Sequence, residues 1–169
     1  MKKNLVLLGM MGVGKTTIGE IVAKKQDMKF IDTDRNIEKK YSMTISEIFD
    51  EKGERFFRIE EEKEVAESVK KNNCVISLGG GAFLNKNTQD AILRNTISVW
   101  LDVDLKTLSE RVKWNKKRPL LNKENSQKKI KQLYSERKDI YELANHKINC
   151  DNLEKEDVAK KIIDFYEKY

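Results

Sequence analysis

Five short apolar runs alternate along the chain with longer segments in which apolar residues recur at helical spacing. Alternation of strands with helices predicts crossover connections and a parallel sheet. Strands that are apolar at nearly every position are typical of a sheet covered by helices on both faces. The pattern therefore predicts the α/β class. The predicted strands are 4–8, 29–31, 74–78, 97–101 and 146–150.

Several helix boundaries can also be read from the residue types. Thr44 and Glu47 have the spacing of a capping box, and Gly53 is suited to end the helix that follows Thr44. A second helical pattern extends from about 54 to 71. Two later amphipathic helices are predicted, with apolar stripes at Ile130, Leu133, Ile140 and Leu143 and between Asp157 and Tyr166.

The length of 169 residues fits one domain with a sizeable core, and we expect residues 1–169 to form it. The formal net charge of +6 would suit a nucleic acid, an anionic membrane surface or a small acidic substrate. Basic and acidic residues are interleaved along most of the chain, however, which is typical of solvated helix faces. Net charge therefore selects none of these partners.

Cys74 and Cys150, the two cysteines, lie in or at the end of predicted strands and match no zinc-binding spacing. We expect both to be buried free thiols. The apolar run at the N-terminus is too short for a signal peptide, and no stretch approaches the length of a membrane span. These features favour a cytoplasmic protein with no membrane partner.

A phosphate-binding loop is predicted directly after the first strand. Residues 9–16 read GMMGVGKT and match GxxxxGK[ST], with a strand before them and a helical segment after them. Backbone N–H groups and the helix dipole can surround phosphate oxygens there, while Lys15 reaches the β and γ phosphates and Thr16 binds Mg2+. Glycines alone could make a tight turn, but a turn does not need the lysine. The predicted nucleotide contacts are Gly12, Val13, Gly14, Lys15, Thr16 and Thr17.

The loop does not define the reaction, because P-loop proteins include switches, motors, translocases and small-molecule kinases. The sequence contains no NKxD-like guanine-binding motif and no obvious hhhhDE strand. These two features disfavour switches and motors, so the remaining motifs must identify the function.

Two carboxylates follow the second predicted strand. Asp32 and Asp34 would lie at the carboxyl end of a parallel strand beside the phosphate loop, where open α/β sheets bind ligands. Asp32 could hold Mg2+ through its water shell, and Asp34 could accept a proton from an acceptor hydroxyl. Alternatively, Asp34 could serve only as the N-cap of the helix that follows.

Three further features are compatible with an anionic acceptor. Arg58 lies beside two phenylalanines, 79–81 are three glycines that can offer N–H groups to an anion, and Arg137 lies among lysines. A guanidinium grips a carboxylate through two parallel hydrogen bonds, whereas lysine acts as a point charge. Each feature also has a simpler reading: a charged helix face, a tight turn and a surface arginine.

Taken together, the motifs GMMGVGKTT, DTD, GERFFRIEEE, SLGGGA and RPLL and the late Arg137 resemble those of the shikimate kinases across nearly the whole chain. The resemblance implies the three-layer P-loop fold of the nucleoside monophosphate kinases, with a central five-stranded parallel sheet flanked by helices, and a mobile lid. It also implies transfer of the γ-phosphoryl group of ATP to the 3-hydroxyl of shikimate, with Mg2+, in chorismate and aromatic amino-acid biosynthesis.

The resemblance assigns the acceptor site to particular residues. Asp34 would face the ring hydroxyls as a catalytic residue. Arg58 and Arg137 would hold the carboxylate of shikimate, and Gly80 would be a further shikimate contact. The substrate-binding helical region would cover about 33–61, with Ile45 and Phe57 as apolar walls.

The nucleotide side is assigned in the same way. Lys15 and Thr16 would take the phosphate and magnesium roles, with Asp32 ordering metal-bound water. Arg111 lies where the family often has an adenine-stacking arginine. The later adenine loop, NCDNLEKED, lacks the basic residue that many members place there.

A lid is predicted over about 113–125, a polar, basic stretch with little periodicity. By resemblance, Arg118 would swing over the phosphates when the acceptor is bound and would be catalytic together with Lys15 and Asp34. A closed lid would exclude water and suppress wasteful ATP hydrolysis. The alternative is a surface loop with no such role.

Two other functions compete with this hypothesis. A related small-molecule kinase, such as gluconate kinase, would share the P-loop and the lid but has no need for two arginines in this arrangement. A non-catalytic ATP-binding or nucleic-acid-binding protein would need a contiguous basic surface with exposed aromatics, whereas the aromatics here fall mostly within apolar periodic patterns. We therefore expect shikimate and ATP as partners, no nucleic acid, and a monomer.

Overall fold

The architecture is a parallel sheet between layers of helices, and the computed structural model describes it over residues 3–113 and 126–169. Beyond Lys113, the lid predicted at about 113–125, with Arg118, lies outside the described residues. The strands follow the order β2-β3-β1-β4-β5, and every neighbouring pair is parallel. The predicted class and five-stranded sheet are confirmed. The strands are β1 (Asn4–Leu8), β2 (Lys29–Asp32), β3 (Cys74–Ser77), β4 (Thr96–Asp102) and β5 (His146–Asn149).

The central and edge strands differ in burial. β1 and β3 are buried along their whole length, and so is β4 up to Asp102. The edge strands expose side chains: Lys29 in β2, and Lys147 and Asn149 in β5. The central strands are therefore buried as expected for a sheet covered on both faces, whereas the edge strands are buried only in part.

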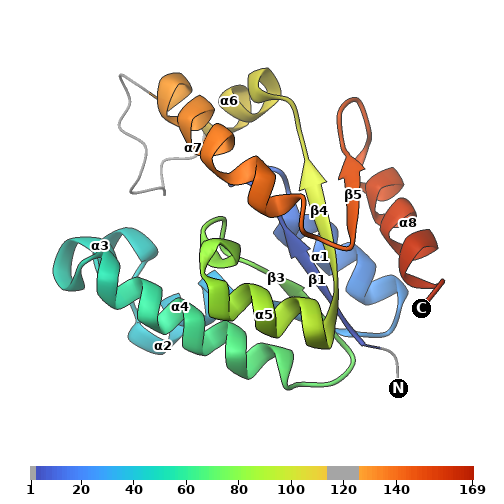
Figure 1. The fold of residues 1–169 in the computed structure, drawn as a ribbon, viewed down its shortest axis with the longest axis horizontal. Coiled ribbons are helices and arrows are strands. Elements are labelled where there is room, and N and C mark those ends of the chain that lie inside the picture. The colour runs from blue at the N-terminus through green and yellow to red at the C-terminus, as the bar shows by residue number, and fades with distance from the viewer. Residues whose placement is uncertain (1–2, 114–125) are drawn as a thin grey trace.

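Helices cover both faces of the sheet. Figure 1 shows α1 and α8 on one face, where they pack against each other, and α4, α5 and α7 on the other. A short 3-10 helix, η1, follows β3 and contacts α4, α5 and α7. The bounds are α1 (Lys15–Lys25), α4 (Glu54–Val69), η1 (Ala82–Leu84), α5 (Lys86–Asn95), α6 (Leu105–Lys113), α7 (Ser126–Tyr141) and α8 (Lys155–Tyr166).

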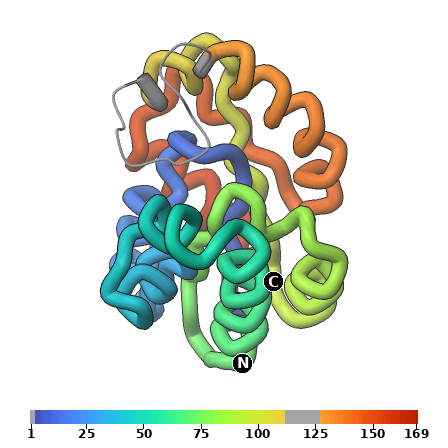
Figure 2. Tube along the Cα trace, turned by 90° about the vertical axis from the view of Figure 1, so that its left-hand side faces the viewer, coloured from blue at the N-terminus to red at the C-terminus, as the bar shows by residue number. Residues whose placement is uncertain are grey.

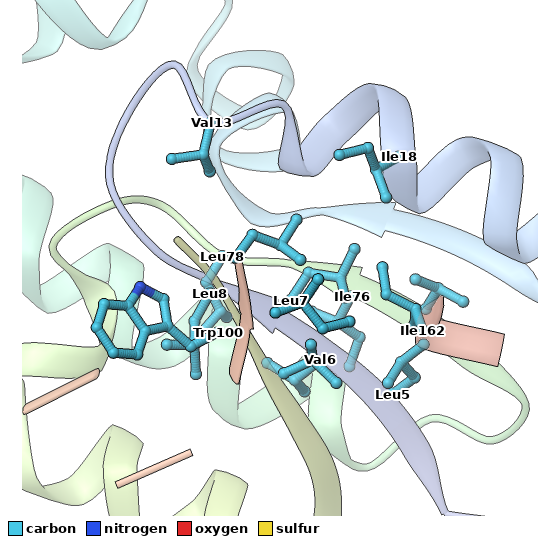
Figure 3. Close-up of a cluster of buried hydrophobic side chains, with 14 of the residues drawn as sticks. Leu5, Val6, Leu7, Leu8, Val13, Ile18, Ile76, Leu78, Trp100 and Ile162 are labelled. Atoms are coloured by element: carbon cyan, nitrogen blue, oxygen red, sulfur yellow. The ribbon is translucent and has the colours of Figure 1, made fainter. Parts of the chain in front are cut away.

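The main core lies between the sheet and these helices. Figure 3 shows Ile18 of α1 and Ile162 of α8 near the apolar side chains of the central strands, among them Leu7 and Ile76. Complete burial of one such side chain stabilises the fold by about 1.5 to 3 kcal/mol. This packing fixes the carboxyl ends of β1, β3 and β4 relative to one another.

A smaller core joins α2 (Thr33–Tyr41), α3 (Ile45–Lys52) and α4, which Figures 1 and 2 show grouped together. It contains the buried side chains of Ile37, Ile48 and Phe57. The predicted capping box starts α3, and Gly53, with a φ of 82°, ends it. The helical region predicted at about 33–61 corresponds to α2, α3 and the first half of α4.

Helix α7 buries a stripe that the sequence predicted only in part. Ile130 and Leu133 are buried as expected, but Leu143 lies beyond the end of α7 and is 52% exposed. The buried stripe instead continues through Arg137 and Tyr141. These two residues are four apart, so they share one face of the helix with the apolar positions.

Both ends of the described chain lie near the amino ends of the central strands, as Figures 1 and 2 show. The hydroxyl of Tyr166 donates a hydrogen bond to the carbonyl of Lys3, 2.7 Å away, and so ties α8 to the start of β1. Over residues 3–113 and 126–169, no helix has both the length and the apolar character needed to cross a membrane.

Candidate active site

Three predicted motifs meet at the carboxyl edge of the sheet. The phosphate loop follows Leu8 of β1, the sequence Asp32-Thr33-Asp34 begins at the end of β2, and Gly79 follows β3. Strand β3 lies between β1 and β2, so the three strand ends are adjacent. Open α/β sheets bind ligands at this edge, where the strand order reverses.

The phosphate loop has the conformation that its glycines permit. Gly14, with a φ of 100°, precedes the first residue of α1 in a left-handed conformation that side chains disfavour. At Gly9 a Cβ atom would lie 2.5 Å from the carbonyl oxygen of Leu101. The loop therefore leads from β1 into the amino end of α1, where backbone N–H groups and the helix dipole favour an anion.

Lys15 places a positive charge inside this loop. Its side chain is buried, and the ammonium group donates hydrogen bonds to the carbonyls of Gly9 and Met10 at 2.8 and 2.9 Å. The charge therefore lies beside the backbone that would surround the phosphates.

Thr16 and Asp32 form the candidate magnesium site. The Thr16 hydroxyl donates to Asp32 Oδ2 at 2.6 Å, while Asp32 Oδ1 accepts from the backbone N–H of Arg35. Asp32, and not Asp34, is thus the N-cap of α2, which corrects the alternative reading of Asp34. A hydroxyl and a carboxylate suit Mg2+, which takes oxygen ligands and keeps several waters. Among the described residues, no group of three or more His, Cys, Asp or Glu side chains could hold a metal ion.

A cavity of about 220 Å3 connects the phosphate loop with the carboxylates. It is small and polar, and it brings a candidate acceptor residue, Asp34, next to the candidate phosphate residues. Its lining residues are Gly12, Gly14, Lys15, Thr16, Thr17, Asp32, Asp34, Ser77, Leu78 and Gly80.

Close packing explains two of the three glycines that follow β3. A Cβ at Gly79 would lie 2.5 Å from Asp34 Oδ1 and 2.6 Å from Glu61 Oε1. A Cβ at Gly81 would lie 2.6 Å from Arg58 Nη1. The glycine loop, residues 79–81, therefore allows Asp34 and Arg58 to approach the backbone from two sides.

Arg58 is held by two carboxylates of its own helix. Its guanidinium lies 2.7 Å from Glu61 and 3.2 Å from Glu54, at spacings of three and four residues on α4. Burial opposes the charge of Arg58, but Glu61 and Glu54 outweigh that effect and raise its pKa. Burial also raises the pKa of Glu61, against the opposing effect of Arg58. Sequence analysis missed Glu61, although its spacing from Arg58 could have indicated the pair.

Arg137 reaches the same loop from α7. Its side chain is buried, and Nη1 donates to the carbonyl of Gly80 at 3.1 Å. Arg58, Gly81 and Arg137 line a second cavity, of about 440 Å3, together with residues of α4, η1, α5 and α7. The structure thus brings both predicted carboxylate-binding arginines to the glycine loop.

Thr33 is a further residue that sequence analysis missed. It is fully buried, donates to the carbonyl of Ser77 at 3.3 Å and accepts from the N–H of Gly79 at 3.2 Å. Its hydroxyl therefore joins the end of β2 to the glycine loop. Its position between Asp32 and Asp34 in the sequence could have indicated that it belongs to the site.

The remaining assignments receive less support from the geometry. Phe57 is buried in the smaller core and Ile45 packs against that core, so their role as pocket walls stays a prediction. Arg111 Nη1 is 3.5 Å from the carbonyl of Val13, which places it next to the phosphate loop. His146, which has no assigned role, stacks on Phe165 with 4.1 Å between the ring centroids.

Comparison with known proteins identifies the family. The family model for shikimate kinase matches residues 11–167, almost the whole chain. The chain belongs to the shikimate kinase family. A shikimate kinase from Sulfurihydrogenibium is 44% identical over 161 residues, which cover 95% of this chain and 96% of the relative. The structure of an Acinetobacter baumannii shikimate kinase in complex with shikimate has a TM-score of 0.95 and 32% identity, and the match covers 99% of this chain and 94% of that chain.

A gluconokinase from Sinorhizobium meliloti shares the fold of this shikimate kinase family member, with a TM-score of 0.62. The match covers 98% of this chain and 92% of that chain, but the identity is only 13%. This likeness supports the P-loop kinase fold alone. The predicted fold is confirmed, and the family favours shikimate over gluconate as the acceptor.

Proposed function

We propose that this protein transfers the γ-phosphoryl group of ATP to the 3-hydroxyl of shikimate, in chorismate and aromatic amino-acid biosynthesis. The observation that carries the proposal is the position of the glycine loop. Asp34 touches it beside the phosphate cavity, and Arg58 and Arg137 touch it on the side of the second cavity. A ring that carries a carboxylate and several hydroxyls could therefore meet two arginines at one end and Asp34 at the other. The A. baumannii relative solved with shikimate supports this acceptor.

ATP would bind with its phosphates in the loop at residues 9–17. Lys15 and the backbone N–H groups would neutralise the phosphate charge, and in-line transfer needs little beyond such positioning. Thr16 and Asp32 would hold Mg2+, Thr16 directly and Asp32 through water. When bound, Mg2+ neutralises charge on the transferring phosphoryl group. Arg111 would lie along the adenine, and Arg118 would close over the phosphates from the lid.

The acceptor would be oriented by Asp34. Its carboxylate would accept a hydrogen bond from the 3-hydroxyl and take up the proton as the oxygen attacks the γ phosphorus, while the bond between the γ phosphorus and the bridging oxygen breaks and ADP leaves. Arg58 and Arg137 would bind the carboxylate of shikimate through charged hydrogen bonds. Backbone N–H groups of the glycine loop, including that of Gly80, would add donors to the same carboxylate.

A nucleic-acid-binding function has less support. Such proteins stack bases on exposed aromatic side chains, whereas the described aromatic side chains are buried or half-buried, apart from Tyr169. We propose that the protein works in the cytoplasm as a monomer, with residues 1–169 acting as one domain.

Product analysis tests the proposed chemistry. Wild-type protein is incubated with ATP, Mg2+ and shikimate, and the product is examined by proton–phosphorus correlation NMR. We expect a single phosphate ester at the 3-position. An ester at another hydroxyl, or none, would contradict the proposed orientation of the acceptor at Asp34.

A further inference from the structure

A buried tyrosine on α7 holds the middle residue of the glycine loop. Tyr141 is 1% exposed, and its hydroxyl donates to the carbonyl oxygen of Gly80, 2.5 Å away. Arg137, one helical turn earlier, donates to the same oxygen. The Gly80 carbonyl therefore receives two hydrogen bonds from one face of α7.

The Gly80 carbonyl differs from those of Gly79 and Gly81 in the source of its hydrogen bonds. The carbonyls of Gly79 and Gly81 accept local backbone hydrogen bonds from Ala82 and Leu84, both at 3.1 Å. Gly80 depends on α7 instead. All three loop oxygens are thus engaged, while within the described part of the chain no hydrogen bond uses the N–H of Gly80 or Gly81. These two N–H groups are therefore available as donors to an anion.

Tyr141 is well placed to fix the loop. Its ring packs against Trp100 of β4, with 5.9 Å between the ring centroids, and its hydroxyl lies 4.0 Å from the sulfur of Met10. A Cβ at Gly80 would lie 3.3 Å from the backbone nitrogen of Met11, so the glycine loop also packs on the phosphate loop. Burial raises the pKa of Tyr141, which keeps the hydroxyl protonated as a donor.

We propose that Tyr141 is a positioning residue for the acceptor. Its hydroxyl holds the carbonyl of Gly80 toward α7, and because the peptide is trans, the N–H of Gly81 points the opposite way. The loop then offers its N–H groups to the acceptor carboxylate and keeps a repulsive oxygen away from it. Tyr141 also shares an acceptor with Arg137 and so helps to fix that guanidinium. This inference rests on the proposed shikimate kinase function.

The variant Tyr141→Phe removes the hydroxyl and keeps the ring. Tyr166→Phe is the matched control, because Tyr166 is also buried and also donates to a backbone carbonyl, at the opposite end of the sheet. Kinetics with ATP and Mg2+ give KM for shikimate, KM for ATP and kcat, and thermal unfolding gives the cost in stability. We expect Tyr141→Phe to raise KM for shikimate by about threefold to thirtyfold, with KM for ATP within about twofold. Tyr166→Phe should lose comparable stability and leave both KM values unchanged.

A second measurement separates positioning from general damage to the fold. A shikimate analogue with a neutral carboxamide in place of the carboxylate is compared as acceptor in both variants and in the wild type. The increase in KM that Tyr141→Phe causes should be smaller with the analogue than with shikimate, because the analogue has no anionic group for the loop to bind. If Tyr141→Phe does not fold, Tyr141→Met is tested in its place with the same expected result.

The outcomes are distinct. Equal KM values for shikimate in wild type and Tyr141→Phe, or equal penalties with the acid and the amide, would overturn the positioning role. Wild-type protein that neither binds nor phosphorylates shikimate would overturn the proposed function itself, and the inference with it.

Discussion

The hydroxyl of Thr16 lies 2.6 Å from Oδ2 of Asp32, which joins the first residues of α1 to the end of β2. This contact sets a hydroxyl and a carboxylate beside the phosphate loop, where Mg2+ would bind with the nucleotide. Asp32 would act on the ion through water, so its charge should affect metal affinity more than acceptor binding.

Asp32→Asn tests this assignment. The amide keeps the shape and an oxygen for the N-cap of α2, and its NH2 group can donate to the Thr16 hydroxyl, but the negative charge is removed. We expect the Mg2+ concentration for half-maximal activity to rise at least about tenfold, as for other groups that act through a metal's water shell. KM for shikimate at saturating Mg2+ should change little. An unchanged magnesium requirement would contradict the role of Asp32.

Arg58→Lys tests whether Arg58 binds the carboxylate of shikimate. Lysine keeps the charge but cannot form two parallel hydrogen bonds, and it would also bind Glu61 differently. We expect kcat/KM for shikimate to fall about a hundredfold, while the dissociation constant for ATP changes less than about twofold. Titration of ATP by calorimetry provides the control. An equal loss of ATP affinity would show that Arg58 serves the fold or the nucleotide instead.

Asp34→Asn tests the residue at the reacting hydroxyl. The variant should fold, because Asp32 and not Asp34 caps α2. Without a carboxylate to receive the proton, we expect kcat to fall at least about a hundredfold. Circular dichroism and thermal unfolding establish that the fold is intact. Turnover near the wild-type rate would remove Asp34 from the catalytic residues.

Glu60 provides a prediction about stability and pH. It is buried between α2 and α4, and hydrogen bonds from Lys40, Lys63 and Tyr41 lower its pKa to about 2. Because the pKa of Glu60 is lower in the folded protein than its ordinary value of 4.5, the carboxylate stabilises the fold at pH values above 4.5. This stabilisation is lost as the pH falls from 4.5 toward 2. Because the lysines are exposed to solvent, we expect Glu60→Gln to cost about 1 to 2 kcal/mol at pH 7.

Urea unfolding at several pH values measures this effect. The difference between wild type and Glu60→Gln should narrow as the pH falls below 4.5. Glu67→Gln is the matched control on the same helix, because Glu67 pairs with Lys70 at the surface, where both side chains are 68% exposed. Glu67→Gln should lower the free energy of unfolding much less than Glu60→Gln. A pH-independent difference for Glu60→Gln would mean that its effect is not electrostatic.

Much of the fold could be predicted because buried strands consist mainly of apolar residues, which form recognisable runs in the sequence. The runs at 4–8 and 74–78 are apolar except at Asn4 and Ser77, since β1 and β3 lie in the middle of the sheet and are buried. The stripe of α7 was harder to predict. Periodicity alone placed Leu143 inside and could not show that a charged residue, Arg137, is buried because it has a partner in Gly80.

The candidate site could be predicted where it consists of local motifs. The phosphate loop with Lys15 and Thr16 follows β1, and Asp32 ends β2. The carboxyl ends of parallel strands share one edge of the sheet, so these residues could be expected to lie together. Tyr141 and Thr33 could not be found in this way. Tyr141 contacts Gly80 across 61 positions of the chain, and Thr33 contacts Gly79 across 46. Such hydrogen bonds exist only once the tertiary structure is formed.

The dependence of ADP release on the acceptor tests the central claim most directly. Release of ADP from ATP and Mg2+ is measured without acceptor and with shikimate, gluconate or quinate. We expect a low rate without acceptor and a strong increase with shikimate alone. A similar increase with gluconate or quinate, or a rate that no acceptor changes, would contradict the assignment of Arg58, Arg137 and Asp34 to a shikimate site.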